Sequence, residues 1–262
     1  MARRRRRRRA RLTWYEGVAL TAFAGVFVIS AVMLGKYFFT AEKEQNEFDE
    51  LAQLVTVQQP ADDAQSGSEA EEQTQTKLSV EELQAINPEA FGWINIPDTR
   101  LDYPVMHTPS DPQKYLRLSF YGAYADSGVP FLEAQCTATS SNLIIYGHNM
   151  KSGSMFHALE GYLDSSYFSA HPSITLTTID KETVYDVIAV LHFKVTDETL
   201  ARYYVIPQTQ EQFESYVATV RADSVYPLNT PAEWGDQLIT LSTCDNVTDD
   251  GRILVIARSK AS

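Results

Sequence analysis

The chain is poor in cysteine, with only Cys136 and Cys244 among its 262 residues. Two cysteines cannot form the several disulfides on which small secreted scaffolds depend. The five histidines are not spaced as metal ligands, and the sequence contains no nucleotide-binding loop, haem motif or calcium loop. We therefore expect no metal ion and no other cofactor.

Positive charge is scarce beyond the first 11 residues. Eight of the 22 Lys and Arg residues lie there, as the unbroken run Arg3–Arg9 and Arg11, and all 34 Asp and Glu residues follow later. The formal net charge is -12. A basic run can bind nucleic acid or can be a solvated tail, and the segment that follows it decides between these readings.

One long apolar run, from Gly17 to Gly35, follows the basic tail and contains no charged residue. At about 1.5 Å per residue its 19 residues span roughly the 30 Å hydrocarbon core of a membrane. It is longer than the apolar part of a signal peptide, and no clear cleavage site follows it. We interpret residues 12–40 as an uncleaved transmembrane anchor with its flanks, in preference to a cleaved signal peptide or a buried helix.

The anchor fixes the expected topology. The positive-inside rule leaves residues 1–11 as a cytoplasmic basic tail of a single-pass cell-membrane protein and places the C-terminal part outside the cell. The arginine run is then a topology signal, and no nucleic-acid partner is expected. Residues 41–78 contain ten acidic residues and two lysines. This composition is typical of an acidic flexible stalk, and its first part can continue as a helix. Residues 79–262 remain as one extracellular domain of ordinary size.

The pattern of this domain predicts a mostly β fold with added helices, closed into a barrel. Ser79 and Glu82 form a capping box that predicts a short helix at its start. Apolar alternation and turn residues predict a hairpin over 92–106 and strands over 128–132, 142–146, 174–178 and 184–195. Residues 211–221 have helical spacing. Many short strands with few helices are typical of a barrel.

The last two expected strands, within residues 240–259, bring together two reactive groups. Asp245 to Gly251 supplies a polar turn, so that Cys244 leaves one strand as Arg252 enters the next. A thiol and a guanidinium at one end of the sheet suit a cysteine nucleophile with a cation that stabilises an oxyanion. Arg258 lies six residues further, about 20 Å along the strand, so Arg252 is the better candidate.

From the residues alone, several readings remain open. Cys244 can be a buried thiol, a partner of Cys136 in a disulfide, or a nucleophile. His148 follows the apolar strand 142–146 and can be a hydrogen-bonded structural residue or an acid and base. Asp245 can be a third catalytic member, although a solvated turn residue is the favoured reading.

Two motifs resemble those of sortases, and most closely those of class B. They are TLSTC at 240–244, followed eight residues later by Arg252, and YGHNMKSGSMF at 146–156. The segments INPEAFGWINIPDTRLDYPVM and KYLRLSFYGAYADSGVPFLE are also similar to that class. The resemblance covers about residues 79–258 and favours the nucleophile reading of Cys244.

The resemblance implies a closed eight-stranded sortase-type β-barrel and a cysteine transpeptidase. His148, Cys244 and Arg252 would be its catalytic residues. The substrate-binding groove would include Leu116, Tyr146 and Ser242, and the strand alternation independently puts Ser242 on the face of Cys244. Where the family often has asparagine, four residues before Leu116, this chain has Pro112.

The resemblance also implies the partners. Secreted proteins with a C-terminal sorting motif would be cleaved after threonine, held as a thioester and joined to an amine of a cell-wall precursor. A pilin-polymerising sortase, whose acceptor is a pilin lysine, is the alternative within the class. A membrane-tethered binding or scaffold module without activity, and a simple cysteine hydrolase, are the alternatives outside it.

Overall fold

The computed structural model describes residues 14–54 and 79–259, which fall into two compact units. One unit ends at Lys43 and the other begins at Glu44. The expected basic tail and most of the expected stalk lie outside the described residues.

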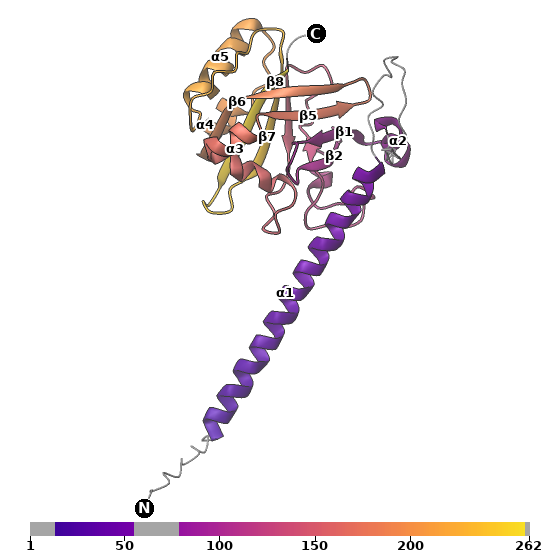
Figure 1. Ribbon diagram of the computed structural model, residues 1–262, viewed down its shortest axis with the longest axis vertical. Helices are drawn as coiled ribbons and strands as arrows, with labels where there is room; N and C mark the ends of the chain where they lie inside the picture. The colour runs from indigo at the N-terminus through magenta and orange to yellow at the C-terminus, as the bar shows by residue number, and fades with distance from the viewer. Residues whose placement is uncertain (1–13, 55–78, 260–262) are drawn as a thin grey trace, which may run out of the picture. The chain divides into compact units, whose positions relative to one another are not determined.

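The described residues of the first unit belong to helix α1 (Trp14–Leu54), drawn in indigo in Figure 1. Its stretch Val18–Phe48 is the one helix among the described residues that is long and apolar enough to cross a membrane. Large apolar side chains such as Phe23, Phe27 and Met33 are 68–76% exposed there. A helix that is apolar on every face suits lipid better than water.

The second unit is a closed barrel of eight strands, which confirms the fold class predicted from the sequence. The order around the barrel is β1-β2-β3-β4-β7-β8-β6-β5. The strands are β1 (Ala90–Asn95), β2 (Asp102–Met106), β3 (Phe131–Leu132), β4 (Asn142–Tyr146), β5 (Ser173–Thr178), β6 (Glu182–Lys194), β7 (Gln237–Cys244) and β8 (Gly251–Ser259).

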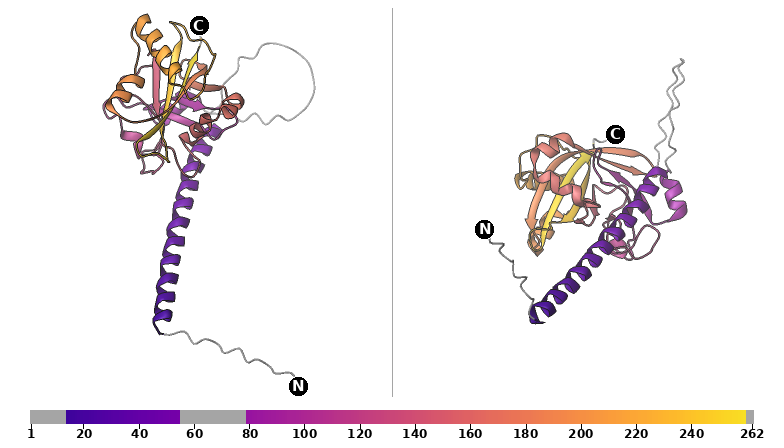
Figure 2. Two further views of the ribbon diagram at one scale, coloured as in Figure 1. Left: turned by 90° about the vertical axis from the view of Figure 1, so that its left-hand side faces the viewer. Right: turned by 60° about the horizontal axis from the view of Figure 1, so that its bottom comes forward.

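Short helices connect the strands. They are α2 (Val80–Ile86), η1 (Lys114–Leu116), η2 (Phe156–Leu163), α3 (Ser165–Ala170), α4 (Asp197–Tyr203) and α5 (Gln210–Ala222). The capping box predicted before α2 is present, since each of Ser79 and Glu82 accepts the backbone N–H of the other. Helix α5 covers the outside of the barrel next to β6, where its Phe213 and Val217 pack against a cluster that includes Leu254 (Figures 1 and 2).

The pairing around β7 determines where the site forms. Strand β4 runs parallel to β7, from Asn142 opposite Leu238 to Tyr146 opposite Ser242. Strand β8 runs antiparallel to β7, with Cys244 opposite Arg252. The carboxyl ends of β4 and β7 and the amino end of β8 therefore meet at one rim of the barrel. Arg258 pairs with Leu238 toward the opposite end and is 4% exposed.

The last turns of α1 belong to the barrel unit. Phe48 and Leu51 are 1% and 0% exposed in its main apolar cluster. The Glu44 carboxylate accepts the backbone N–H groups of Asp126 and Ser127 at 3.0 and 3.1 Å. Residues 44–54 thus contribute to the folded unit through both packing and hydrogen bonds.

We predict that Leu51→Ala lowers the free energy of unfolding of residues 44–262 by about 2–5 kcal/mol, because it leaves a cavity in the core. Urea denaturation measures this loss. Ile86→Ala is the control, since Ile86 is 46% exposed and its loss should cost well under half as much. Equal effects of the two substitutions would show that the end of α1 does not stabilise the barrel.

Candidate active site

His148 lies just beyond the end of β4 and Cys244 is the last residue of β7, and hydrogen bonds hold these two segments together. The Gly147 N–H donates to the Ser242 carbonyl at 3.1 Å. The Thr243 hydroxyl donates to the Gly147 carbonyl at 2.8 Å, and the Asn149 side-chain amide donates to the Cys244 carbonyl at 2.9 Å. The backbone of both candidate residues is therefore fixed in relation to the other.

Position 147 must be glycine, because the Phe156 ring fills the space that a side chain there would occupy. A Cβ atom at Gly147 would lie 2.6–2.8 Å from atoms of the Phe156 ring. Phe156 is fully buried, and its N–H donates to the His148 carbonyl at 2.9 Å. A larger residue at 147 would displace either the ring or the segment that carries His148.

Cys244 presents its side chain to solvent while its backbone stays paired. The thiol is free and exposed, and Nη1 of Arg252 donates a hydrogen bond to its Sγ. The backbone N–H of Asp245 donates to the Gly251 carbonyl at 2.8 Å, which closes the turn between β7 and β8. The sulfur and the guanidinium are thus in contact at the barrel rim, as the hairpin pattern predicts.

The ring of His148 is held by the backbone of η1. Its Nε2 lies 3.0 Å from the Leu116 carbonyl oxygen. A carbonyl only accepts, so Nε2 carries a proton and Nδ1 is the nitrogen that gains or loses one. Burial lowers the pKa of His148 below its usual 6.5, and the Leu116 carbonyl partly opposes this shift. The charges of Arg117 and Arg252 lower the pKa further.

One pocket of about 370 Å³ is lined by all six residues predicted from the sequence. They are Leu116, Tyr146, His148, Ser242, Cys244 and Arg252. Pro112 also lines it. The Tyr146 hydroxyl donates to Glu133, another lining residue, at 2.8 Å. Among the described residues, no three His, Cys, Asp or Glu side chains are arranged to hold a metal ion.

Tyr204 and Asn149 contribute to the site but were not predicted. The Tyr204 hydroxyl lies 2.8 Å from the Ser242 hydroxyl, and its ring stacks on Tyr146 with centroids 5.9 Å apart. Burial raises the pKa of Tyr204, so it is neutral. Tyr204 follows α4 and carries no sequence signal, whereas Asn149 sits beside His148 in the motif that carries the resemblance.

Asp245 stabilises the turn that follows Cys244. Its carboxylate accepts the N–H groups of Val247 and Thr248 at 2.8 and 3.1 Å and pairs with Nε2 of His192 at 2.9 Å. Hydrogen bonding, led by Thr248, lowers its pKa to about 2. The favoured reading as a turn residue describes this geometry, but the side chain is only 6% exposed and is not solvated.

The disulfide reading of the two cysteines is wrong, because both thiols are free. Cys136 is 1% exposed, and its Sγ donates to the Asn142 carbonyl at 3.3 Å. Burial raises the pKa of its thiol to about 11. The buried-thiol reading of Cys244 is also wrong, because Cys244 is the accessible sulfur and Cys136 is the buried one.

Comparison with known proteins agrees with this geometry. The family model described as the Sortase domain matches residues 94–260. Sortase B of Listeria monocytogenes is 33% identical over 249 residues, covering 92% of this chain and 95% of that protein. Sortase B of Staphylococcus aureus is 26% identical over 192 residues, covering 71% and 76%.

Solved structures give the same result. Sortase B from Listeria monocytogenes has a TM-score of 0.60 at 32% identity, covering 69% of this chain and 99% of that one. Sortase B from B. anthracis has a TM-score of 0.69 at 26% identity, covering 86% and 100%. The chain belongs to the sortase family of cysteine transpeptidases. Its similarity is to class B members, as the motifs indicate.

We predict that iodoacetamide alkylates one thiol in the native protein, Cys244, and that Cys136 reacts only after unfolding. Burial and a raised pKa keep Cys136 as an inaccessible thiol. Peptide mass spectrometry after a short native pulse measures both sites, with a urea-unfolded sample as control. Labelling of Cys136 at the rate of Cys244 would contradict this assignment.

Proposed function

We propose that this sortase cleaves a C-terminal sorting motif after threonine and transfers the acyl group to an amine of a cell-wall precursor. His148, Cys244 and Arg252 would carry out the reaction. The observation that supports it best is the pocket in which an exposed thiol contacts a guanidinium and a half-buried imidazole is also a lining residue.

The first half-reaction forms a thioester. The Cys244 thiolate attacks the threonine carbonyl carbon, and Arg252 donates hydrogen bonds to the oxyanion that develops. The C–N bond then breaks, and His148 gives the proton on Nδ1 to the leaving amine. Because the Leu116 carbonyl holds Nε2, the imidazole exchanges protons without losing its orientation.

The second half-reaction transfers the acyl group. The acceptor amine attacks the thioester carbonyl, neutral Nδ1 of His148 takes the proton from that amine, and the C–S bond breaks to restore the Cys244 thiolate. A solved sortase B complexed with triglycine supports an acceptor with a free amino end. A neutral amine is a stronger nucleophile toward a thioester than water, and partial exclusion of water by a bound peptide would favour transfer further.

The peptide would bind along the pocket beside the catalytic groups. Leu116 offers an apolar contact, and Tyr146 and Ser242 lie on adjacent strands in register. A solved Staphylococcus aureus sortase B–substrate complex, 25% identical to this chain with a TM-score of 0.63, supports substrate binding on this fold. Pro112 supplies no side-chain hydrogen bond, so this edge of the pocket would select for shape.

Residues 12–40 would anchor the enzyme with residues 1–11 in the cytoplasm. The exposed apolar surface of α1 and the arginine run before it support this orientation. The barrel unit would then face exported substrates and acceptor amines on the outer side of the membrane. Because residues 44–54 pack in the barrel unit, they are excluded from the stalk expected over 41–78.

We predict that Cys244→Ala abolishes thioester formation, while Cys136→Ala leaves its rate nearly unchanged. Mass spectrometry of the protein after incubation with a small library of sorting peptides measures the acyl adduct and identifies the preferred motif. Cys136→Ala is the matched control, because it removes the only other thiol of the chain. An inactive Cys136 variant together with an active Cys244 variant would refute the proposal.

We predict that the acidic limb of the pH–rate profile lies below pH 6.5, since burial lowers the pKa of His148. Arg117→Gln should move this limb to higher pH, because removing a nearby positive charge raises that pKa. The shift should be a fraction of a pH unit and smaller at high salt, as Arg117 is exposed. Arg202→Gln, which removes a cation paired with Asp223, is the control. If Arg117→Gln did not shift the acidic limb, the charge of Arg117 would not be lowering the pKa of His148.

A further inference from the structure

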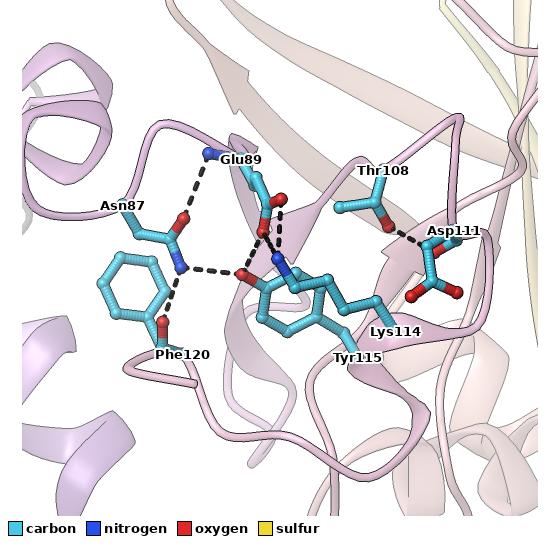
Figure 3. A network of polar contacts seen from close by, with 7 residues as sticks. All are labelled: Asn87, Glu89, Thr108, Asp111, Lys114, Tyr115 and Phe120. Atoms are coloured by element: carbon cyan, nitrogen blue, oxygen red, sulfur yellow. Dashed lines mark hydrogen bonds and ion pairs between the residues drawn. The ribbon is translucent and has the colours of Figure 1, made fainter. Parts of the chain in front are cut away.

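The two sequence segments that precede the catalytic motifs meet at one carboxylate, that of Glu89. Glu89 stands directly before β1, and Lys114 and Tyr115 form the start of η1. The Lys114 ammonium lies 2.7 Å from both oxygens of Glu89, and the Tyr115 hydroxyl donates to one of them at 2.6 Å (Figure 3). Lys114 and Tyr115 lower the pKa of Glu89, so it is ionised at neutral pH.

Asn87 completes this cluster from the end of α2. Its side-chain amide donates to the Tyr115 hydroxyl at 2.8 Å and to the Phe120 carbonyl at 2.6 Å, and its oxygen accepts the Glu89 N–H at 3.1 Å (Figure 3). The Tyr115 hydroxyl thus donates once and accepts once, which satisfies a side chain that is 2% exposed. The start of η1 has little freedom to rotate.

The other side of η1 is held by the backbone. The Val129 N–H donates to the Tyr115 carbonyl at 3.0 Å. Gly128 has φ +57, and a Cβ there would lie 2.5 and 2.6 Å from the carbonyl oxygens of Tyr115 and Leu116. Only glycine allows so close an approach in this conformation. The η1 turn is therefore fixed from both sides.

The next carbonyl along the chain is that of Leu116, which accepts the Nε2 proton of His148 at 3.0 Å. It belongs to the residue directly after Tyr115, whose hydroxyl Glu89 and Asn87 hold. This oxygen belongs to the backbone and cannot move independently, so its position is set by the backbone of the η1 turn. A displaced turn would release the imidazole to rotate.

We propose that Glu89 is a positioning residue for His148, because its hydrogen bonds to Lys114 and Tyr115 hold the Leu116 carbonyl that orients the imidazole. This inference rests on the proposed role of His148 in proton transfer. Glu89 does not line the pocket, so its effect would pass through η1. Glu89 belongs to the segment INPEAFGWINIPDTRLDYPVM, and Lys114 and Tyr115 to the segment KYLRLSFYGAYADSGVPFLE. Both segments would then help to orient His148.

The charges around His148 determine the direction of the expected change. Arg117 and Arg252 disfavour its protonated form, Asp126 favours it, and burial opposes it. The Leu116 carbonyl is the hydrogen-bond partner that favours protonation. Loosening the turn weakens that bond and leaves the opposing effects in place, so the titration of His148 moves to lower pH.

The test compares Glu89→Ala and Glu89→Gln with Asp223→Asn in the full chain. Asp223 is a matched control, since it accepts from Arg202 at 2.6 Å and from the adjacent Tyr203 hydroxyl at 3.0 Å. Nitrogen and proton NMR of histidine-labelled protein reports which ring nitrogen of His148 carries the proton and where the ring titrates. Turnover is measured with the library peptide that gives the most thioester.

We expect Glu89→Ala to lower kcat about tenfold or more, with a smaller change in KM, as misplacement of about 1 Å can cost up to 100-fold. The His148 titration should move to lower pH and its Nε2 proton should become less localised. Glu89→Gln retains an acceptor for Tyr115 and should restore part of both effects. Asp223→Asn should change neither, although it can lower the melting temperature.

Unchanged His148 spectra in Glu89→Ala would overturn the proposal even if the rate fell, as would equal spectral shifts in Asp223→Asn. Shifted spectra with unchanged kcat would also overturn it. If Glu89→Ala does not fold, Tyr115→Phe removes one hydroxyl, keeps the buried ring, and carries the same test. Full activity of His148→Ala would instead refute the proposed function, and the spectra would still decide whether Glu89 places the ring.

Discussion

The site depends on the parallel pairing of β4 with β7. Residues 142–146 and 238–242 are in register, and polar contacts continue the pairing until Asn149 reaches the Cys244 carbonyl. Residues almost 100 positions apart in the chain are thereby held within one hydrogen-bonded ladder. Strand β8 pairs antiparallel with β7, and the register of this pairing places Arg252 opposite Cys244. The sheet therefore sets the positions of Cys244 and Arg252, while His148 lies on the segment just beyond β4 and its ring is held by the Leu116 carbonyl of η1.

The three proposed reacting groups differ in their access to solvent. Cys244 is exposed, Arg252 is half-buried beside it, and His148 is half-buried against η1. Burial and two neighbouring guanidinium groups lower the pKa of the imidazole and keep it mostly neutral near neutral pH. A neutral imidazole suits removal of a proton from an incoming amine, while the smaller protonated fraction serves the leaving group. The Cys244 sulfur contacts the Arg252 guanidinium, so a protonated imidazole is not the only cation available to stabilise the thiolate.

Much of the barrel and of the site could be predicted from local signals. Alternation and turn residues defined the hairpin of β1 and β2, and an eight-residue spacing was enough to place Cys244 opposite Arg252. Contacts that depend on tertiary packing could not be predicted. Tyr204 has no periodic pattern around it, and Asp245 pairs with His192 of β6, which is 53 residues away in the chain. The packing of Leu51 was hidden because its surroundings have the composition of a solvated segment.

The burial of Cys136 has a consequence for oxidative chemistry. The buried sulfur of Cys136 cannot approach that of Cys244 without opening the barrel, so the chain holds no resolving thiol for Cys244. In an oxidising environment, a sulfenic acid formed on Cys244 would persist or be captured by a small thiol or a second molecule. Recovery of activity would then depend on an external reductant, and repair within one molecule would require unfolding.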